Sequence, residues 1–302
     1  MKRVINFMGM RRLAFTITLV MTLVSVACLA VKGLNYGLDF TGGTLIELNY
    51  EEAADLNKIR EQLHSGGYPD AVVQSFGAVS DVLVRMPGDD PELGNQVAEV
   101  LRQASGTQMT VKRVEFVGPA VGEELRDQGG LGMLLALAGI MVYLGFRFQW
   151  KFGLAAIIGL FHDVIITLGV FSYFQLTFDL TVLAAILAII GYSLNDTIVV
   201  FDRIRENFRF LRNTSLIDNI NISTTQTLLR TLATSISTLL AVAALLIFGG
   251  DNLWGFALAL FIGVGVGTYS SIYVSSILLI WLKLTVEDLI PPVATEEVDE
   301  TP

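Results

Sequence analysis

Cysteine and charged residues are both scarce in this chain of 302 residues. Cys28 is the only cysteine, which excludes an internal disulfide and most thiolate metal sites. Charged residues make up 16% of the chain and hydrophobic residues 53%. Because soluble domains carry about 25% charged residues, the composition predicts a membrane protein with several spans.

Motifs of several enzyme and nucleotide-binding classes are also missing. The sequence contains no G-x-S-x-G nucleophile elbow, no H-E-x-x-H zinc helix and no G-x-x-x-x-G-K-[ST] phosphate loop. We therefore expect no enzymatic activity, no metal site and no cofactor. The net charge of −9 and the predicted compartment also argue against nucleic acid as a partner.

Six segments are apolar enough and long enough to cross a bilayer, which requires about 20 mostly apolar residues. Lys and Arg residues cluster before the first of these segments and after the second, fourth and sixth. Under the positive-inside rule, both termini are then cytoplasmic, and the long loop after the first span is periplasmic. The expected layout is a cytoplasmic N-terminus over 1–12, spans over 13–31, 130–148, 152–174, 178–201, 228–249 and 253–282, a periplasmic domain over 32–128 and an acidic cytoplasmic tail over 284–302.

The first span has an alternative interpretation as a removed signal peptide, because basic residues precede its apolar stretch. The stretch is long for a signal peptide, and no clear A-x-A cleavage site follows it. We therefore expect an uncleaved anchor.

The loop over 32–128 is polar and long enough for one small domain. Alternating and helical hydrophobic patterns predict strands over 44–50, 71–76, 81–86 and 108–117, and helices over 52–65 and 91–104. The resulting order, βαββαβ, predicts an α+β ferredoxin-like domain with both helices on one face of an antiparallel sheet.

Glycine-rich segments join this domain to the first and second spans. Adjacent glycines permit backbone angles that other residues avoid, which suits either a tight turn or a mechanical hinge. Both interpretations remain open from the sequence. The candidate hinge residues are Gly37, Asp39, Gly42, Gly43 and Gly118.

A polar cluster interrupts the span over 178–201. Ser193, Asn195 and Asp196 lie close together within it. An aspartate near the centre of a membrane helix costs roughly 2.5–3.5 kcal/mol, so such a residue indicates a functional site. Asp196 is the strongest candidate of the chain.

Three further ionisable residues lie inside predicted spans. His162 and Asp163 fall near the middle of the third span, and Arg230 lies near the start of the fifth, at a depth similar to that of Asp196. We expect Asp196 and Arg230 to face each other in the bundle interior. The alternatives are that Asp163 only bonds another helix and that Arg230 extends toward the interface.

This arrangement predicts a proton relay. Burial in lipid favours a neutral carboxyl group, whereas a nearby arginine favours the charged form. Movement of Arg230 relative to Asp196 would therefore change the proton affinity of the carboxylate. We expect Asn195, Ser193 and Thr167 to orient waters or the carboxylate, with Asp163 as a further relay group and His162 in a lesser role.

Several long motifs resemble the SecD/SecF family of protein-export membrane proteins, on its SecF side, within the RND superfamily. They cover 37–44 (GLDFTGGT), 116–122, 162–167, 191–196, 202–207 and 226–231. The resemblance implies half of an RND-type membrane core, completed by SecD, in the bacterial inner membrane. It also implies SecYEG, YajC and a translocating unfolded polypeptide as partners, and proton flow that drives export. Asp196 matches the carboxylate of the family's fourth span, and Arg230 matches the arginine of its fifth.

Two other functions remain alternatives. A self-contained RND-type exporter of small molecules would need a broad apolar pocket, for which the small soluble domain leaves little room. A scaffold without energy coupling would tolerate Asp196→Asn, because an amide keeps the volume and hydrogen bonding of the carboxyl group but does not titrate.

Overall fold

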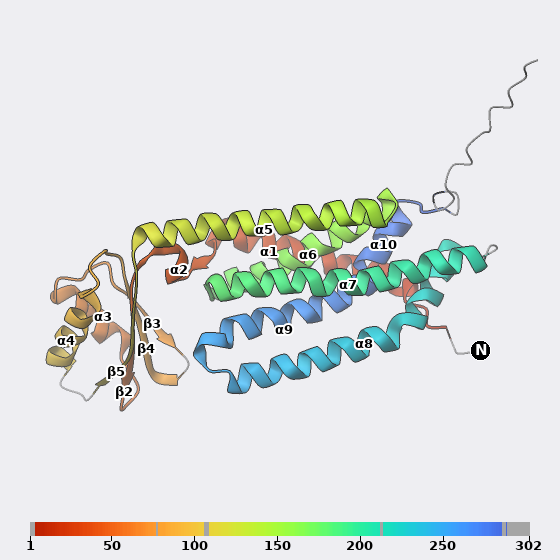
Figure 1. Cartoon of the computed structure of the whole chain (residues 1–302). Coiled ribbons are helices and arrows are strands. Elements are labelled where there is room, and N and C mark those ends of the chain that lie inside the picture. The colour runs from red at the N-terminus through yellow and green to blue at the C-terminus, as the bar shows by residue number, and fades with distance from the viewer. Residues whose placement is uncertain (1–3, 77, 106–108, 212–213, 286–287, 289–302) are drawn as a thin grey trace, which may run out of the picture.

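The computed structural model describes residues 4–76, 78–105, 109–211, 214–285 and 288. Most of the predicted acidic tail therefore lies outside the described residues. Long helices form a bundle with a small sheet-containing domain at one end, and the described N-terminal segment lies at the opposite end (Figure 1). We call these the soluble-domain end and the far end.

Six helical segments of the described chain are long and apolar enough to cross a membrane, which confirms the predicted class. A short 3-10 turn, η1 (Met8–Met10), precedes the first of them. The last span is made of two helices, which are separated at Tyr273. The helices are α1 (Arg11–Lys32), α5 (Pro119–Arg147), α6 (Trp150–Phe174), α7 (Leu180–Phe210), α8 (Leu216–Phe248), α9 (Asp251–Ile272) and α10 (Val274–Trp281).

The helices extend beyond the segments that hydropathy selects. α5 begins at Pro119, and proline suits the first position of a helix because its missing N–H would be unsatisfied there. Residues 119–128, which the sequence assigns to the soluble domain, therefore form the first turns of this helix. α7 likewise continues to Phe210, well past the apolar segment over 178–201.

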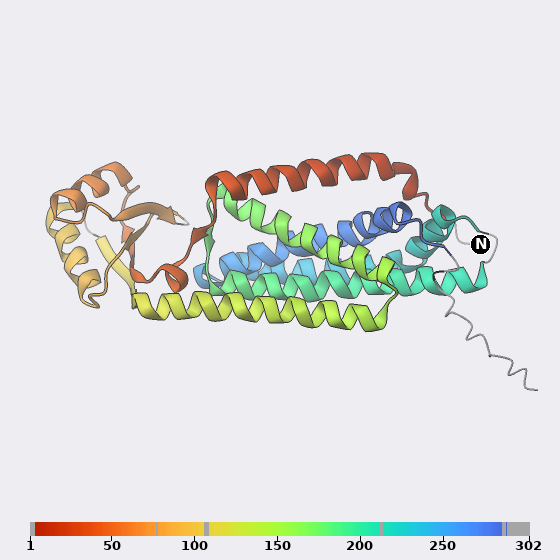
Figure 2. The same cartoon turned by 90° about the horizontal axis from the view of Figure 1, so that it is seen from above.

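α6 and α7 are the central helices of the bundle, and each buries apolar residues along its whole length. α1 and α5 lie on opposite sides of the bundle (Figure 2). Both expose most of their apolar side chains, as α8 does. Such surfaces suit contact with lipid or with another membrane protein.

The soluble domain has the predicted βαββαβ order. Its sheet is antiparallel throughout, with the strand order β3-β4-β2-β5. Ile46 and Leu48 of the sheet pack with Leu63 and Leu101 of the two helices in one core, so both helices cover the same face. The elements are β2 (Gly43–Tyr50), α3 (Leu56–Ser65), β3 (Val72–Phe76), β4 (Ala78–Met86), α4 (Leu93–Ser105) and β5 (Met109–Val117).

A short joint connects this domain to the bundle. The two-residue strand β1 (Asn35–Tyr36) pairs in parallel with β6 (Thr177–Phe178), which directly precedes α7. The one-turn helix α2 (Leu38–Thr41) follows β1 and packs against α5. The uncovered face of the sheet consequently turns toward the soluble-domain end of the bundle (Figure 1).

Candidate functional site: buried carboxylates in the helix bundle

Asp196 lies on α7 and is 6% exposed. Its Oδ1 accepts a hydrogen bond of 2.8 Å from the Thr231 hydroxyl on α8, and its Oδ2 accepts one of 2.8 Å from the Ser271 hydroxyl on α9. Hydroxyl groups both donate and accept hydrogen bonds. The same three side chains can therefore satisfy a charged or a protonated carboxyl group without rearranging the helices.

Ser271 owes its position to the interruption of the last span. The break at Tyr273 lies between two serine pairs, Ser270-Ser271 and Ser275-Ser276, all of which are buried. Serine pairs are a common cause of sharp helix bends, because their hydroxyls compete for backbone carbonyls. Ser271 does donate to the carbonyl of Thr268 as well as to Asp196.

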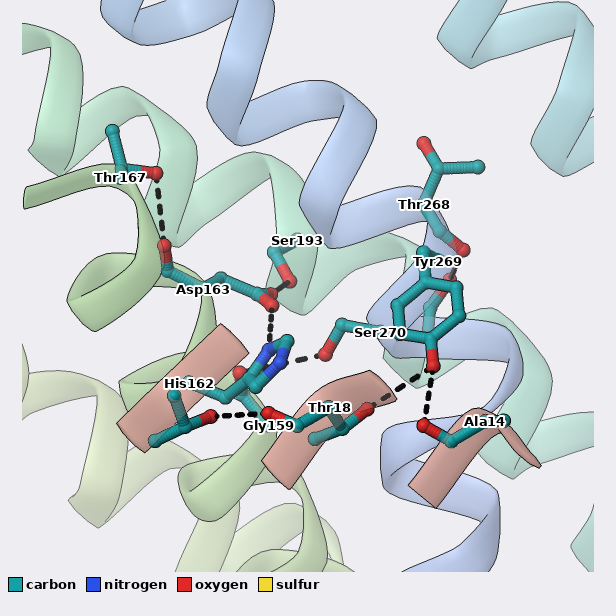
Figure 3. A network of polar contacts seen from close by, with 12 residues as sticks. Ala14, Thr18, Gly159, His162, Asp163, Thr167, Ser193, Thr268, Tyr269 and Ser270 are labelled. Atoms are coloured by element: carbon teal, nitrogen blue, oxygen red, sulfur yellow. Dashed lines mark hydrogen bonds and ion pairs between the residues drawn. The ribbon is translucent and has the colours of Figure 1, made fainter. Parts of the chain in front are cut away.

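A second carboxylate, Asp163 on α6, lies in a separate hydrogen-bonded group (Figure 3). It is 1% exposed. Its Oδ1 lies 2.8 Å from His162 Nδ1, and its Oδ2 accepts a hydrogen bond of 2.5 Å from the Ser193 hydroxyl on α7. This group joins the two central helices of the bundle.

The position of the hydrogen on the His162 ring follows from the partners of its two nitrogens. His162 Nε2 is buried and has no hydrogen-bond partner among the described residues. A buried N–H without a partner is costly, so the geometry favours a ring hydrogen on Nδ1, which is donated to Asp163. His162 and Ser193 then both donate to the Asp163 carboxyl group.

The two carboxylate groups are neighbours along α7. Ser193 bonds Asp163 and lies three residues before Asp196, which is about one helical turn. Gly267 of α9 lies against the Asp163 group, since a Cβ atom there would be 3.1 Å from Ser193 Cβ and 3.6 Å from Asp163 Oδ2. Glycine at this position allows α9 to approach α7 and α6 closely.

The expected pairing of Asp196 with Arg230 is wrong within this chain. Arg230 is exposed, and its side chain makes no hydrogen bond or ion pair with any residue that the structure describes. Adjacent residues of an α-helix point about 100° apart, so α8 can turn only one of Arg230 and Thr231 toward Asp196. The structure turns Thr231 inward.

Three supporting residues also have positions that differ from the expected ones. Asn195 is exposed, one residue from the buried Asp196. Ser193 bonds the carboxylate of Asp163 rather than that of Asp196. Thr167 donates to the backbone carbonyl of Asp163, one turn earlier on the same helix, and so does not orient a carboxylate.

Sequence reasoning missed the two residues that bond Asp196 directly. Thr231 had a detectable signal, because Ser223, Thr227, Thr231 and Ser235 recur at every fourth position, which places them along one side of a helix. The sequence signal for Ser271 was weaker and consisted of the paired serines on either side of Tyr273. The bonding partners of a buried carboxylate depend on packing between helices, which hydropathy does not report.

The glycines of the joint are packed closely. Gly42 and Gly43 have φ values of +65° and +107°, a region that favours glycine. A Cβ at Gly42 would lie 2.8 Å from Pro119 Cα, and one at Gly122 would lie 2.8 Å from Gly42 N. Gly118, in contrast, has φ −61°, and the nearest atom to its Cβ would be 4.0 Å away.

Two further residues tie the joint to α7. Gly37 donates its backbone N–H to the Phe178 carbonyl at 2.8 Å. Asp39 Oδ2 accepts a hydrogen bond of 3.0 Å from the backbone N–H of Leu180, the first residue of α7. The five candidate hinge residues thus lie at one place, where the soluble domain meets α5 and α7.

A cavity of about 770 Å³ lies between the uncovered sheet face and the soluble-domain end of the bundle. Arg85 projects from β4 into its wall and donates to the Tyr36 carbonyl at 2.7 Å. Burial lowers the pKa of Arg85. Arg113 of β5 donates a hydrogen bond of 2.5 Å to the side-chain oxygen of Asn252 on α9, across the cavity. The charged side chains of the lining are Asp39, Arg85, Arg113, Glu115 and Asp179.

Metal ligands do not gather in the described part of the chain. It contains no group of three or more His, Cys, Asp or Glu side chains that could hold a metal ion. The chemistry that the buried groups offer is proton transfer between carboxyl, imidazole and hydroxyl groups.

The sequence matches two family models. That of the protein export membrane protein SecD/SecF C-terminal region covers residues 96–285, and that of the SecD/SecF GG motif covers residues 29–54. The chain belongs to the SecD/SecF family. The GG motif includes Gly42 and Gly43, the two glycines of the joint with positive φ.

Relatives of known name place the chain on the SecF side of this family. It is 67% identical to protein translocase subunit SecF of Pseudomonas aeruginosa, over 99% of this chain and 98% of that protein. It is 49% identical to the protein of the same name from Vibrio alginolyticus, over 98% and 95% of the two chains.

Solved structures in the SecD/SecF family share the fold. A crystal structure of SecDF, a translocon-associated membrane protein from Thermus thermophilus, matches with a TM-score of 0.85 and 42% identity. A super-membrane-facing form of SecDF matches with a TM-score of 0.69 and 41% identity. The matches cover 93% and 94% of this chain but 39% of each solved chain, so this chain spans about two fifths of the SecDF chains.

Proposed function

We propose that the chain is a SecF-type subunit of the protein translocase, which pairs with SecD and uses the proton motive force to promote export of unfolded polypeptide. The observation that carries this proposal is the environment of Asp196. A titratable carboxyl group lies inside the bundle, held by hydroxyls from two other helices and without a basic partner among the residues that the structure describes. Such a group can gain and lose a proton, which supports a role in proton-coupled transport.

The missing basic partner supports a site shared between two subunits. Arg230 and Asn195 are exposed beside the buried Asp196 and Thr231, on helices whose outer surfaces are otherwise mostly apolar. An arginine facing hydrocarbon costs several kcal/mol, whereas one facing another subunit finds polar partners. We propose that SecD covers Arg230 and Asn195, as the 39% coverage of the SecDF chains suggests.

The energy of proton flow is sufficient for mechanical work. One elementary charge that crosses a membrane potential of 100 mV releases about 2.3 kcal/mol. We propose that the charge state of Asp196 shifts α7, and that the second group, in which Ser193 of α7 bonds Asp163 beside His162 on α6, passes this shift to α6. The joint at Gly37, Asp39, Gly42, Gly43 and Gly118 transmits this shift to the soluble domain.

Localisation follows from the charge distribution. Arg147, Arg203 and Arg205 lie at the far end, where Arg147 pairs with Asp202 at 2.5 Å. The positive-inside rule makes this end cytoplasmic and the soluble domain periplasmic in a bacterial inner membrane. The proposed complex also contacts SecYEG, YajC and the translocating polypeptide.

The cavity beneath the sheet gives little support to the alternative function of a small-molecule exporter. A small-molecule exporter needs a broad apolar pocket, but the 770 Å³ space beneath the sheet has five charged residues in its lining. The scaffold alternative predicts that the titration of Asp196 is dispensable, which makes that residue the best test.

The test uses Asp196→Asn and Arg230→Met, each in complex with SecD in membrane vesicles. We expect both substitutions to abolish the proton-gradient-dependent part of export while the complex still assembles, because neither one removes a packed apolar side chain. Thr234→Ser is the matched control, since it keeps the hydroxyl that bonds the Arg230 carbonyl. Normal gradient-dependent export by either of the first two variants would reject the relay and favour the scaffold.

A further inference from the structure

The buried side of α8 is polar for most of its length. Its buried residues toward the far end include Asn219, Ser223, Thr227 and Thr231, spaced four apart, and none of the four is more than 8% exposed. We call this set the polar column. Buried polar groups in a membrane helix are expensive and mark either contacts between helices or a pathway for ions.

Hydrogen bonds occupy the polar column at both of its ends. Asn207 of α7 donates to Ser223 Oγ at 2.7 Å, and Ser223 donates to Asn219 Oδ1 at 2.9 Å. At the other end, Thr231 donates to Asp196 Oδ1 at 2.8 Å. Between them the Thr227 hydroxyl donates to the Ser223 backbone carbonyl at 3.0 Å.

A neighbouring hydroxyl indicates where a further ligand binds. Thr224 is 1% exposed, and its Oγ1 has no hydrogen-bond partner among the described residues. It lies three residues before Thr227 and seven before Thr231, hence on the same side of α8. Residues one turn apart have Cβ atoms about 5–6 Å apart, a gap that a hydrogen-bonded water spans.

The other half of the bundle interior is different. From Asp196 toward the soluble-domain end, the residues that α7 buries include Val182, Ala185, Ile186 and Ile189. Beyond Ser235, the buried residue of α8 is Val242. Gly263 of α9 closes against Ile189, where even a Cβ atom would overlap the isoleucine. Between α7, α8 and α9, polar side chains therefore extend from Asp196 mainly toward the far end.

We propose that the polar column, with Asn207 and Thr224, binds water and forms the cytoplasmic half of the proton pathway to Asp196, whereas the periplasmic half lies outside α7, α8 and α9 of this chain. This inference rests on the proposed function for the direction of the membrane. In the final step, a hydronium ion in the column gives a proton to the Thr231 hydroxyl and becomes water, while Thr231 passes its own hydroxyl proton to Asp196 Oδ1. The hydroxyl thus stays neutral, and one proton has moved.

Accessibility of single cysteines to Ag⁺ tests the polar column independently of export. In a Cys28→Ala background, Thr224→Cys and Thr227→Cys report on the column, and Ile186→Cys and Ile189→Cys are the matched apolar controls. The SecD complex in inverted vesicles is treated with Ag⁺ from the exposed cytoplasmic side, denatured and then labelled with a maleimide. We expect Ag⁺ to block labelling at Thr224→Cys and Thr227→Cys at least tenfold faster than at either control.

Equal rates at the column and control positions would overturn the inference, even if Asp196→Asn abolishes export.

A measurement of proton flux is a second test of the inference. Thr227→Val should reduce flux about tenfold, whereas Thr227→Ser, which restores the hydroxyl, should conduct like the unsubstituted chain. Unchanged proton flux in Thr227→Val would also overturn the inference. If export does not depend on the gradient but Ag⁺ still reaches the column, the proposed function fails and the inference of a water-filled column holds.

Discussion

Asp39 Oδ2 accepts a hydrogen bond from the backbone N–H of Leu180 at a distance of 3.0 Å. The two residues lie 141 positions apart in the sequence, at the joint of the soluble domain and at the start of α7. A carboxylate at a helix N-terminus satisfies a free N–H group and is stabilised by the helix dipole. The soluble domain is therefore attached to the helix that carries Asp196.

Removal of this attachment should loosen the joint. Asp39→Ala should destabilise the first turn of α7 by about 0.5–2 kcal/mol, the usual effect of losing a side-chain cap. Hydrogen exchange of the Leu180 amide should accelerate correspondingly, and gradient-dependent export should slow. Asp39→Asn retains an acceptor oxygen and should have a smaller effect. Unchanged exchange in Asp39→Ala would show that the hydrogen bond contributes nothing to the joint.

The two halves of the glycine-rich joint should differ in their tolerance of substitution. Gly43→Ala should prevent stable folding of the soluble domain, because φ is +107° and a Cβ would overlap the Met86 carbonyl oxygen. Gly118→Ala should fold normally, since its φ is −61° and its Cβ has room. Thermal unfolding of both variants in detergent tests the difference. Equal melting temperatures would contradict the requirement for glycine at 43.

The Thr231 hydroxyl should be necessary for the stability around Asp196. Thr231→Val keeps the shape of the side chain but leaves Asp196 with Ser271 as its remaining hydroxyl partner, which should cost about 1–3 kcal/mol. Thr231→Ser restores the donor and should recover most of this loss. The measurement is the unfolding temperature of the chain in detergent. A valine variant as stable as the serine variant would count against the hydrogen bond.

Arg230 should matter for the complex and not for the stability of the isolated chain. Because its side chain makes no hydrogen bond or ion pair with any described residue, Arg230→Met should change the stability of the isolated subunit by less than about 0.5 kcal/mol. The same variant should lose gradient-dependent export in complex with SecD. Marked destabilisation of the subunit alone would reveal a contact within the chain.

The soluble domain should lose one stabilising contribution in acid. The hydrogen bond from Asn49, followed by that from Lys112, lowers the pKa of Asp81. The contribution of this carboxylate is therefore complete above its ordinary value of about 3.9 and disappears as the pH falls through the lower folded value. The difference in unfolding free energy between the unsubstituted chain and Asp81→Asn should shrink from pH 6 to pH 3. A constant difference would contradict the lowered pKa.

Long-range hydropathy and short-range periodicity predicted most of the fold. The six apolar helices and the βαββαβ order both follow from repeated patterns over many residues, where single exceptions carry little weight. The break at Tyr273 had no comparable signal, because neither proline nor glycine marks it.

The orientation of α8 was harder to predict. Its exposed side includes Leu229 and Leu240, whereas its buried side includes Ser223 and Thr231, the reverse of a helix in a soluble protein. Hydrophobicity therefore does not indicate which side faces the bundle. Arg230 was expected inside because charged groups in membranes usually avoid lipid. The structure leaves it outside, at the surface where we propose that SecD binds.

α7 has the geometry of a lever arm. Sixteen residues separate Asp196 from Leu180, which corresponds to about 24 Å of rigid helix at 1.5 Å per residue. A tilt of about 10° around Asp196 would displace the Leu180 end by about 4 Å, comparable with the motions of known switching helices. A small shift at one protonated carboxyl group would thus become a larger displacement of the whole domain from Gly43 to Val117, because the length of α7 amplifies it.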